Sequence, residues 1–487
     1  MKKNRVELLL LVAILIVAAF FRFNKIMTLP PGLYPDEAMN GNNALEAIAT
    51  HNFKVFYPEN NGREGLFINI QAVFLKILLP LNHNQPAAWM LRLPSAFFGI
   101  LTVLGVFFLT KELFKKIGLA ALASFLTAVS FWHINFSRIG FRAIMAPFFL
   151  TWASYFLIKS FRNSNSKFYF LNSIFSGVLY GLGFYSYIAY RATPALILFI
   201  VLFYWFKNKE RGVRKKILLS TFYFLFSTLI VVLPLAFYFL KNPADFFGRT
   251  AQISIFSAVS PLKALALNIL KTAAMFNFAG DWNWRHNVAG QPELFWPVGI
   301  LFLIGVFLSI KNLTKKPAND WKLSIPLVWL VVAALPVVVS NESLPHALRS
   351  LLMIPPVFII AGFGGLWLYE KAKRKRLKIF ASVLFLIFLI GQSYLNYFKT
   401  WGENLETKNA FSQNYVDIAR VLNSLPKEMP KYVIVQSGGT DVRGFPMPTQ
   451  TVMFLTDTFL PKNRAEKNIH YVFPGETIPA RAFTTRI

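Results

Sequence analysis

Two adjacent carboxylates, Asp36 and Glu37, closely follow the first apolar segment of the chain. Ionisable groups near lipid are costly and commonly mark functional sites. The two acids also open an alanine-containing segment, where acids in a first turn simply stabilise a helix. We interpret the pair as an active-site acid at the membrane face, with Asp36 as general base and Glu37 in a positioning or acceptor-binding role.

Five arginines lie in segments that we assign to the outside of the membrane, where positive charge is unexpected. Guanidinium groups stay charged and bind phosphate through two parallel hydrogen bonds, so the set suits an anionic headgroup. Each arginine alone is equally explained by snorkelling to lipid or by pairing with an acid. We predict that five arginines bind the phosphate of a lipid-linked donor substrate: Arg63, Arg138, Arg142, Arg285 and Arg349.

Polar and aromatic residues of the same segments are candidates for substrate binding. Tryptophan stacks on sugar rings, although it is also a common interfacial anchor. The candidates are Tyr34, Asp281, Trp284, His286 and His346. The six histidines show no ligand spacing such as HExxH, so a histidine-based metal site is not expected and no residue is assigned to a metal. No cofactor is assigned, and dependence on a divalent metal is left open.

The composition is typical of a polytopic helical membrane protein, with 55% hydrophobic and 15% charged residues in a chain of 487. The net charge of +29 does not indicate nucleic-acid binding, because the basic residues form short clusters between apolar segments. The chain has no cysteine, which excludes disulfides, thiolate metal sites and thiol catalysis.

About eleven apolar segments are long enough to span a membrane. The first follows Lys2, Lys3 and Arg5 as in a signal peptide, but we interpret it as an uncleaved helix. Basic clusters before this span and after every second span predict a cytoplasmic N-terminus and an extracytoplasmic C-terminus. The predicted spans are 6–23, 91–110, 117–136, 143–159, 168–190, 192–206, 217–240, 295–310, 323–340, 350–369 and 378–398.

Residues 1–399 are therefore predicted to form a transmembrane catalytic domain, with a first external loop at 24–90 and a large external loop at 241–294. Within the first loop, residues 66–81 are apolar but short and carry polar side chains, which favours an amphipathic helix in the outer interface.

The polar tail, residues 400–487, is predicted to form a small extracytoplasmic α/β domain. Its pattern indicates a helix at 415–425 and strands at 431–435, 452–455 and 469–473. The expected fold is thus an all-α polytopic membrane protein with interfacial helices and a small C-terminal α/β domain.

The chain resembles the GT-C glycosyltransferases, specifically the group of protein O-mannosyltransferases and lipid A aminoarabinose transferases. The resemblance covers roughly residues 5–400 and is carried by Asp36-Glu37, Arg92-Leu93-Pro94-Ser95, and the segments 137–142 and 345–350. It implies a GT-C-type fold and a transferase that uses a polyprenyl-monophosphate sugar, with Asp36 as catalytic base. It also implies phosphate-binding roles for Arg63 and Arg285.

Two departures from the group are visible. Arg63-Glu64-Gly65 stands where aminoarabinose transferases have a Lys-Pro-Pro type segment, and the loop 241–294 is too short for the domain inserted in eukaryotic O-mannosyltransferases. A generic bacterial member with an unknown acceptor fits best.

The predicted function is an inverting glycosyltransferase that moves a sugar from a polyprenyl-monophosphate donor to an acceptor hydroxyl of a protein, lipid or glycan. The expected place is the outer face of the plasma (inner) membrane. One alternative is an O-antigen ligase or polymerase with a diphosphate-linked donor, which does not depend on a first-loop acid. Another is a flippase or transporter for a lipid-linked solute, but such proteins place ionisable groups near the bilayer midplane, and the apolar segments here carry almost none.

Overall fold

The structure is a computed structural model that describes residues 2–162, 168–252, 255, 260–314, 321–341 and 343–487. The chain divides into two compact units. The helical unit contains Met1–Asn24, Ala96–Ser137 and Arg142–Tyr397, and the loop–tail unit contains Lys25–Ser95, Arg138–Phe141 and Phe398–Ile487.

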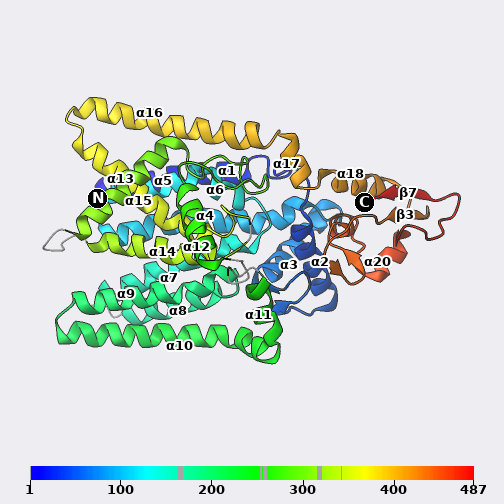
Figure 1. The fold of residues 1–487 in the computed structure, drawn as a ribbon, viewed down its shortest axis with the longest axis horizontal. Coiled ribbons are helices and arrows are strands. Elements are labelled where there is room, and N and C mark those ends of the chain that lie inside the picture. Colours follow the sequence, from blue (N-terminus) through cyan, green and yellow to red (C-terminus); the bar gives the residue numbers. More distant parts are fainter. Residues whose placement is uncertain (1, 163–167, 253–254, 256–259, 315–320, 342) are drawn as a thin grey trace. The chain divides into compact units, whose positions relative to one another are not determined.

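The helical unit is built from long apolar helices that pack side by side. Helix α8 lies between α7 and α10, and α15 packs against both α5 and α13 (Figure 1). The helices are α1 (Lys2–Phe23), α4 (Ala88–Phe114, which begins in the loop–tail unit), α5 (Ile117–Val129), α6 (Phe131–Phe136), α7 (Met145–Arg162), α8 (Tyr169–Gly183), α9 (Pro194–Lys207), α10 (Arg211–Lys241), α11 (Pro243–Gln252), α12 (Pro261–Ala274), α13 (Trp296–Leu313), α14 (Ser324–Val338), α15 (Ile354–Lys371) and α16 (Lys375–Tyr394).

Glycines allow the closest of these helix pairs. A Cβ atom added to Gly305 of α13 would lie 2.0 Å from the carbonyl oxygen of Ile360, and one added to Gly364 of α15 would lie 2.1 Å from that of Leu301. Only a residue without a side chain fits such backbone contact, which is the usual way in which membrane helices approach one another.

Eight helices in the described part of the chain are long and apolar enough to cross a membrane. This finding confirms a multi-pass membrane protein, and the eight helices overlap eight of the predicted spans. The spans predicted at 117–136, 168–190 and 323–340 contain the shorter helices α5, α8 and α14, of 13, 15 and 15 residues. The first of these breaks because Ser130 is extended and its side chain caps α6 by accepting from the His133 backbone N–H. The number of spans is therefore not fixed at eleven.

The first part of the loop–tail unit contains two helices joined by a short hairpin. Its elements are α2 (Pro35–Thr50), β1 (Phe56–Tyr57), β2 (Arg63–Glu64) and α3 (Leu66–Leu78), with β1 antiparallel to β2. The amphipathic helix predicted at 66–81 corresponds to α3, and its position in the membrane interface stays a prediction.

The tail forms a three-stranded parallel sheet in the order β6-β3-β7 with short helices around it. The strands predicted at 431–435 and 469–473 and the helix predicted at 415–425 are confirmed. The strand predicted at 452–455 is wrong, because these residues belong to a helix whose residues are all buried, and a short apolar run does not distinguish the two. The elements are α17 (Leu405–Ala410), α18 (Gln413–Ser424), β3 (Lys431–Ile434), β4 (Asp441–Val442), β5 (Phe445–Pro446), α19 (Thr449–Leu455), α20 (Pro461–Glu466), β6 (Ile469–Val472) and β7 (Phe483–Arg486).

The tail shares its hydrophobic core with the first loop. Ala44 and Ile68 of α2 and α3 belong to the same buried cluster as Val433 and Val452 of the tail. A Cβ atom at Gly41 of α2 would lie only 2.5 Å from a ring carbon of Phe454, so the two segments pack closely. The compact unit around α2 is therefore larger than either the predicted loop 24–90 or the predicted domain 400–487.

Candidate functional site

Asp36 lies in the first turn of α2, where the helix and two neighbouring side chains orient its carboxylate. Pro35 is the first residue of the helix, and a negative charge at this end interacts favourably with the helix dipole. Asn60 Nδ2 and Arg63 Nη2 donate to the same oxygen, Asp36 Oδ1, over 2.7 and 3.0 Å. The Asp36 side chain keeps 37% of its surface exposed. The arrangement presents an oriented carboxylate that a substrate hydroxyl can reach.

The β1–β2 hairpin positions Arg63. Gly62 precedes it with a φ of +78°, and a Cβ atom at Gly65 would lie 2.1 Å from the carbonyl oxygen of Lys54. Both positions require glycine. The Arg63 side chain is 5% exposed and its guanidinium donates to Asp36. This geometry supports a role in positioning Asp36 in place of the predicted phosphate binding.

Glu37 is fully buried, whereas the side chain of its neighbour Asp36 is 37% exposed. Arg92 donates to both carboxylate oxygens, from Nε over 3.0 Å and from Nη2 over 3.1 Å, and the Gly140 N–H donates to Oε2 over 2.6 Å. Arg92 also donates to the carbonyl oxygens of Pro30 and Gly32. Glu37 therefore anchors the turn before α2, which supports the positioning half of its predicted role and leaves no exposed surface for an acceptor.

Two further predicted residues lie in the loop–tail unit. Arg138 is fully buried and donates to the carbonyl oxygen of Leu29 over 3.0 Å, with its guanidinium 5.3 Å from the centre of the Phe398 ring. These contacts brace the loop, and the phosphate-binding role of Arg138 stays a prediction. Tyr34 is partly exposed and its ring meets Phe141 edge-on, so it stays a candidate for substrate binding.

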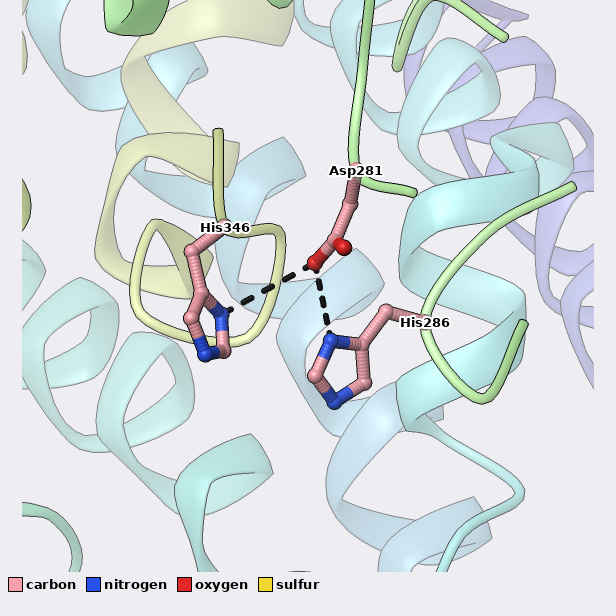
Figure 2. Close-up of side chains that lie close together, drawn as sticks. All are labelled: Asp281, His286 and His346. Atoms are coloured by element: carbon pink, nitrogen blue, oxygen red, sulfur yellow. Dashed lines mark hydrogen bonds and ion pairs between the residues drawn. The ribbon is translucent and has the colours of Figure 1, made fainter. Parts of the chain in front are cut away.

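The helical unit brings together Asp281, His286 and His346 from two loops, those between α12 and α13 and between α14 and α15. Asp281 Oδ2 lies 2.8 Å from His286 Nδ1 and 3.8 Å from His346 Nδ1. Figure 2 shows the carboxylate pointing toward both imidazoles. One ligand atom of each residue lies within 4.8 Å of the others, so the group could hold a metal ion. The sequence spacing of the histidines did not predict such a centre.

Helix α6 holds both of these loops. Asn135 Nδ2 donates to the backbone carbonyls of Arg285 and His286 over 2.8 and 3.0 Å. Trp132 Nε1 donates to the carbonyl oxygen of Ala347 over 3.0 Å. Sequence reasoning missed both residues, because they lie in a predicted span and their partners are more than a hundred residues away.

The protonation of the cluster follows from its burial and its internal hydrogen bonds. Burial lowers the pKa of His286 despite the neighbouring Asp281 carboxylate, and burial together with the other imidazole and Arg349 lowers the pKa of His346 well below its usual range. Burial alone would raise the pKa of Asp281, but the hydrogen bond with His286 and the two imidazoles keep it below its ordinary value. At neutral pH the cluster is an ionised carboxylate beside two neutral imidazoles.

The remaining predicted residues of this unit differ in exposure. Arg349 is buried and donates to Ser340 Oγ. Arg142 and Arg285 are partly exposed, as is Trp284, and the Arg142 guanidinium lies 6.0 Å from the centre of the Tyr187 ring. Of the predicted phosphate-binding arginines, Arg142 and Arg285 are thus the two that are partly exposed, whereas Arg63, Arg138 and Arg349 are buried.

Comparison with known proteins supports the fold. Residues 70–238, less than half of the chain, match a family model described as dolichyl-phosphate-mannose-protein mannosyltransferase. No curated protein matches the chain in sequence.

Two solved structures resemble this one over most of its length. Archaeal oligosaccharyltransferase AglB from Archaeoglobus fulgidus, in complex with an inhibitory peptide and a dolichol-phosphate, is 13% identical with a TM-score of 0.55, over 96% of this chain and 64% of that chain. ArnT from Cupriavidus metallidurans, bound to undecaprenyl phosphate, is 13% identical with a TM-score of 0.55, over 95% of this chain and 89% of that chain. The chain therefore spans less than two thirds of AglB. These likenesses confirm the predicted GT-C-type fold.

Proposed function

We propose that the protein is an inverting glycosyltransferase that moves a sugar from a polyprenyl-monophosphate donor to an acceptor hydroxyl. The observation that carries the proposal is the exposed and oriented Asp36 carboxylate at the start of α2, held by Asn60 and Arg63. The partial match to a mannosyltransferase family model and the likeness to two proteins bound to polyprenyl phosphates support the same class.

The proposed reaction is a single displacement. Asp36 takes the proton from the acceptor hydroxyl while the hydroxyl oxygen attacks the anomeric carbon of the donor sugar. The bond between that carbon and the phosphate oxygen breaks, and the polyprenyl phosphate leaves with the electron pair. Arg142 and Arg285 are the candidates for binding this phosphate, since guanidinium groups stabilise developing negative charge. The product carries the opposite anomeric configuration.

The acceptor is a hydroxyl of a protein, lipid or glycan, and the proposal assigns no cofactor to the transfer step. The distribution of basic clusters supports a cytoplasmic N-terminus and a reaction on the outer face of the plasma (inner) membrane.

The test is transfer from a panel of labelled polyprenyl-monophosphate sugars in proteoliposomes, comparing the wild type with Asp36→Asn. The matched control is Asp417→Asn, which changes an exposed carboxylate of the same unit that pairs with Arg420. We expect Asp36→Asn to lower the rate roughly 10²–10⁴-fold, the range that a general base contributes. The control should transfer at the wild-type rate, and the product should have an inverted anomeric centre.

Equal transfer by Asp36→Asn and the wild type would contradict the proposal and favour the ligase alternative. Labelled lipid that crosses the bilayer without transfer would favour the flippase.

A further inference from the structure

We propose that Asp281, His286 and His346 form a binding site for a divalent transition-metal ion, with Zn²⁺ as the ion that this ligand set suits best. The inference concerns the helical unit alone and is independent of the proposed transfer reaction. It begins from the convergence of three potential ligands on two loops that are far apart in the sequence (Figure 2).

The distances between the potential ligand atoms agree with a metal site. Zinc bonds to imidazole nitrogen and carboxylate oxygen are about 2.0–2.1 Å long, which places neighbouring ligands of a tetrahedral ion about 3.3 Å apart. Asp281 Oδ2 lies 2.8 Å from His286 Nδ1 and 3.8 Å from His346 Nδ1, on either side of that value. The two imidazole ligand atoms lie within 4.8 Å of each other, so the histidine side chains would move closer together to complete the coordination.

A simple hydrogen-bonded Asp–His pair does not explain the third residue. Such a pair accounts for Asp281 and His286, which are in direct contact. His346 Nδ1 is buried and has no hydrogen-bond partner among the residues that the structure describes, although it faces the same carboxylate. A buried polar atom without a partner is costly. A metal ion shared with Asp281 and His286 would satisfy it.

Backbone N–H groups fix the orientation of the Asp281 carboxylate, as is usual for a metal ligand. The Asn283 N–H donates to Asp281 Oδ1, and the Ala347 N–H donates to Oδ2, each over 2.8 Å. The Asp281 N–H in turn donates to the buried Glu293 over 3.0 Å. Groups that fix the orientation of metal ligands in this way commonly matter for affinity nearly as much as the ligands.

The ligand types decide which ion fits. Imidazole nitrogen suits zinc and neighbouring transition metals, whereas magnesium and calcium prefer a shell of oxygen atoms. Three protein ligands leave one position of a tetrahedral ion open. Arg285 and Arg349 lie near enough to influence both imidazoles, and their positive charges would favour an anionic fourth ligand.

The consequence for the fold is a link between two loops. The ion would join the segment before α13, which carries Asp281 and His286, to the segment before α15, which carries His346. The Trp132 and Asn135 side chains of α6 already hold the backbone of the same two segments.

The experiment measures metal bound to the full-length chain purified in detergent. The protein is stripped with a chelator, equilibrated with Zn²⁺ in the presence of excess Mg²⁺, freed of unbound ions and analysed by elemental mass spectrometry. The variant His346→Ala removes the third ligand, and His470→Ala is the control because His470 is an exposed histidine on β6. We expect about one zinc ion per chain in the wild type and the control, and loss of this ion in His346→Ala.

A second variant keeps the test decisive if His346→Ala fails to fold. The chain has no cysteine, so His346→Cys introduces a single thiolate, which is itself a good zinc ligand. With Co²⁺ as the probe, this variant should keep one bound ion and show a thiolate charge-transfer band that the wild type lacks. A wild-type chain that binds no zinc would overturn the proposal. Zinc in His346→Ala at the wild-type level, or a His346→Cys–Co²⁺ complex without the thiolate band, would also overturn it.

Discussion

Asp36 of the loop–tail unit and Asp281 of the helical unit have opposite surroundings. Asp36 is 37% exposed and receives hydrogen bonds from the Arg63 guanidinium and the Asn60 amide. Asp281 is 5% exposed and faces two imidazoles. The first arrangement suits a carboxylate that exchanges a proton with a substrate, and the second suits a carboxylate that binds a metal ion. The neighbours of an acid, more than its residue type, decide its chemistry.

The largest expected effect on stability is that of Arg92→Met, which tests whether the buried Glu37, unlike the exposed Asp36, anchors the structure. The substitution leaves the buried Glu37 without its bidentate partner, and removal of one member of a buried ion pair costs about 3–5 kcal/mol. The thermal unfolding temperature in detergent should fall strongly. Arg420→Met, which breaks an exposed pair in the same unit, is the control. Equal unfolding temperatures for the two variants would argue against Glu37 as an anchor.

Asn135→Ala tests whether α6 supports the cluster of Asp281, His286 and His346. The variant leaves the carbonyl oxygens of Arg285 and His286 without their side-chain donor, at a cost of about 1–3 kcal/mol. Because the loop then holds its ligands less well, zinc affinity should fall about 10–100-fold. Asn172→Ala removes an exposed side-chain hydrogen bond to a helix carbonyl and is the control. Unchanged zinc affinity in Asn135→Ala would show that α6 does not position the cluster.

Asn60→Gly tests whether Asn60 orients the Asp36 carboxylate, and its expected effect is smaller. Asn60 has a φ of +51°, so glycine removes its side chain without adding backbone strain. Loss of its hydrogen bond to Asp36 should raise the activation free energy of transfer by about 1 kcal/mol, which lowers the transfer rate roughly fivefold to tenfold. The exposed neighbour Asn61, with a φ of +62°, provides Asn61→Gly as a matched control. If both variants transfer sugar equally well, Asn60 has no positioning role.

The smallest expected effect concerns an ion pair that joins the tail to the first loop. Arg443 donates to both oxygens of Glu46 and to Glu59, and this hydrogen bonding keeps the pKa of Glu46 below its ordinary value of 4.5. The contribution to stability is present at neutral pH and is lost as the pH falls through the lowered pKa.

Arg443→Met should therefore lower stability by about 1 kcal/mol or less at neutral pH, because the pair is partly exposed. The difference from the wild type should shrink in acid once Glu46 is protonated. Unfolding temperatures measured across this pH range check the prediction, and a difference that grows in acid would contradict it.

The sequence predicted much of the local structure but not the pairing of distant side chains. The apolar segments and the basic residues between them indicated a membrane protein of helices, and acids after Pro35 indicated the start of α2. The breaks that shorten α5, α8 and α14 were missed, because apolar composition continues across them.

The partners of the site residues were harder to predict. Glu37 contacts Arg92 and Gly140, which lie 55 and 103 residues further along the chain, so its burial leaves no local signal. His286 and His346 are separated by a whole helix pair, α13 and α14, which is why motif spacing did not reveal the cluster. The contact between Arg63 and Asp36 was not predicted, because it depends on the hairpin between them, and the phosphate-binding role of Arg63 stays a prediction.

The most direct test of the division of roles is a parallel comparison of Asp36→Asn and Asp281→Asn, each assayed for sugar transfer and for bound zinc. We expect Asp36→Asn to retain about one zinc ion per chain and to lose transfer, and Asp281→Asn to lose the zinc ion. Full transfer activity in Asp36→Asn, loss of zinc in Asp36→Asn, or retention of zinc in Asp281→Asn would each contradict the assignment of the base to one aspartate and the metal to the other.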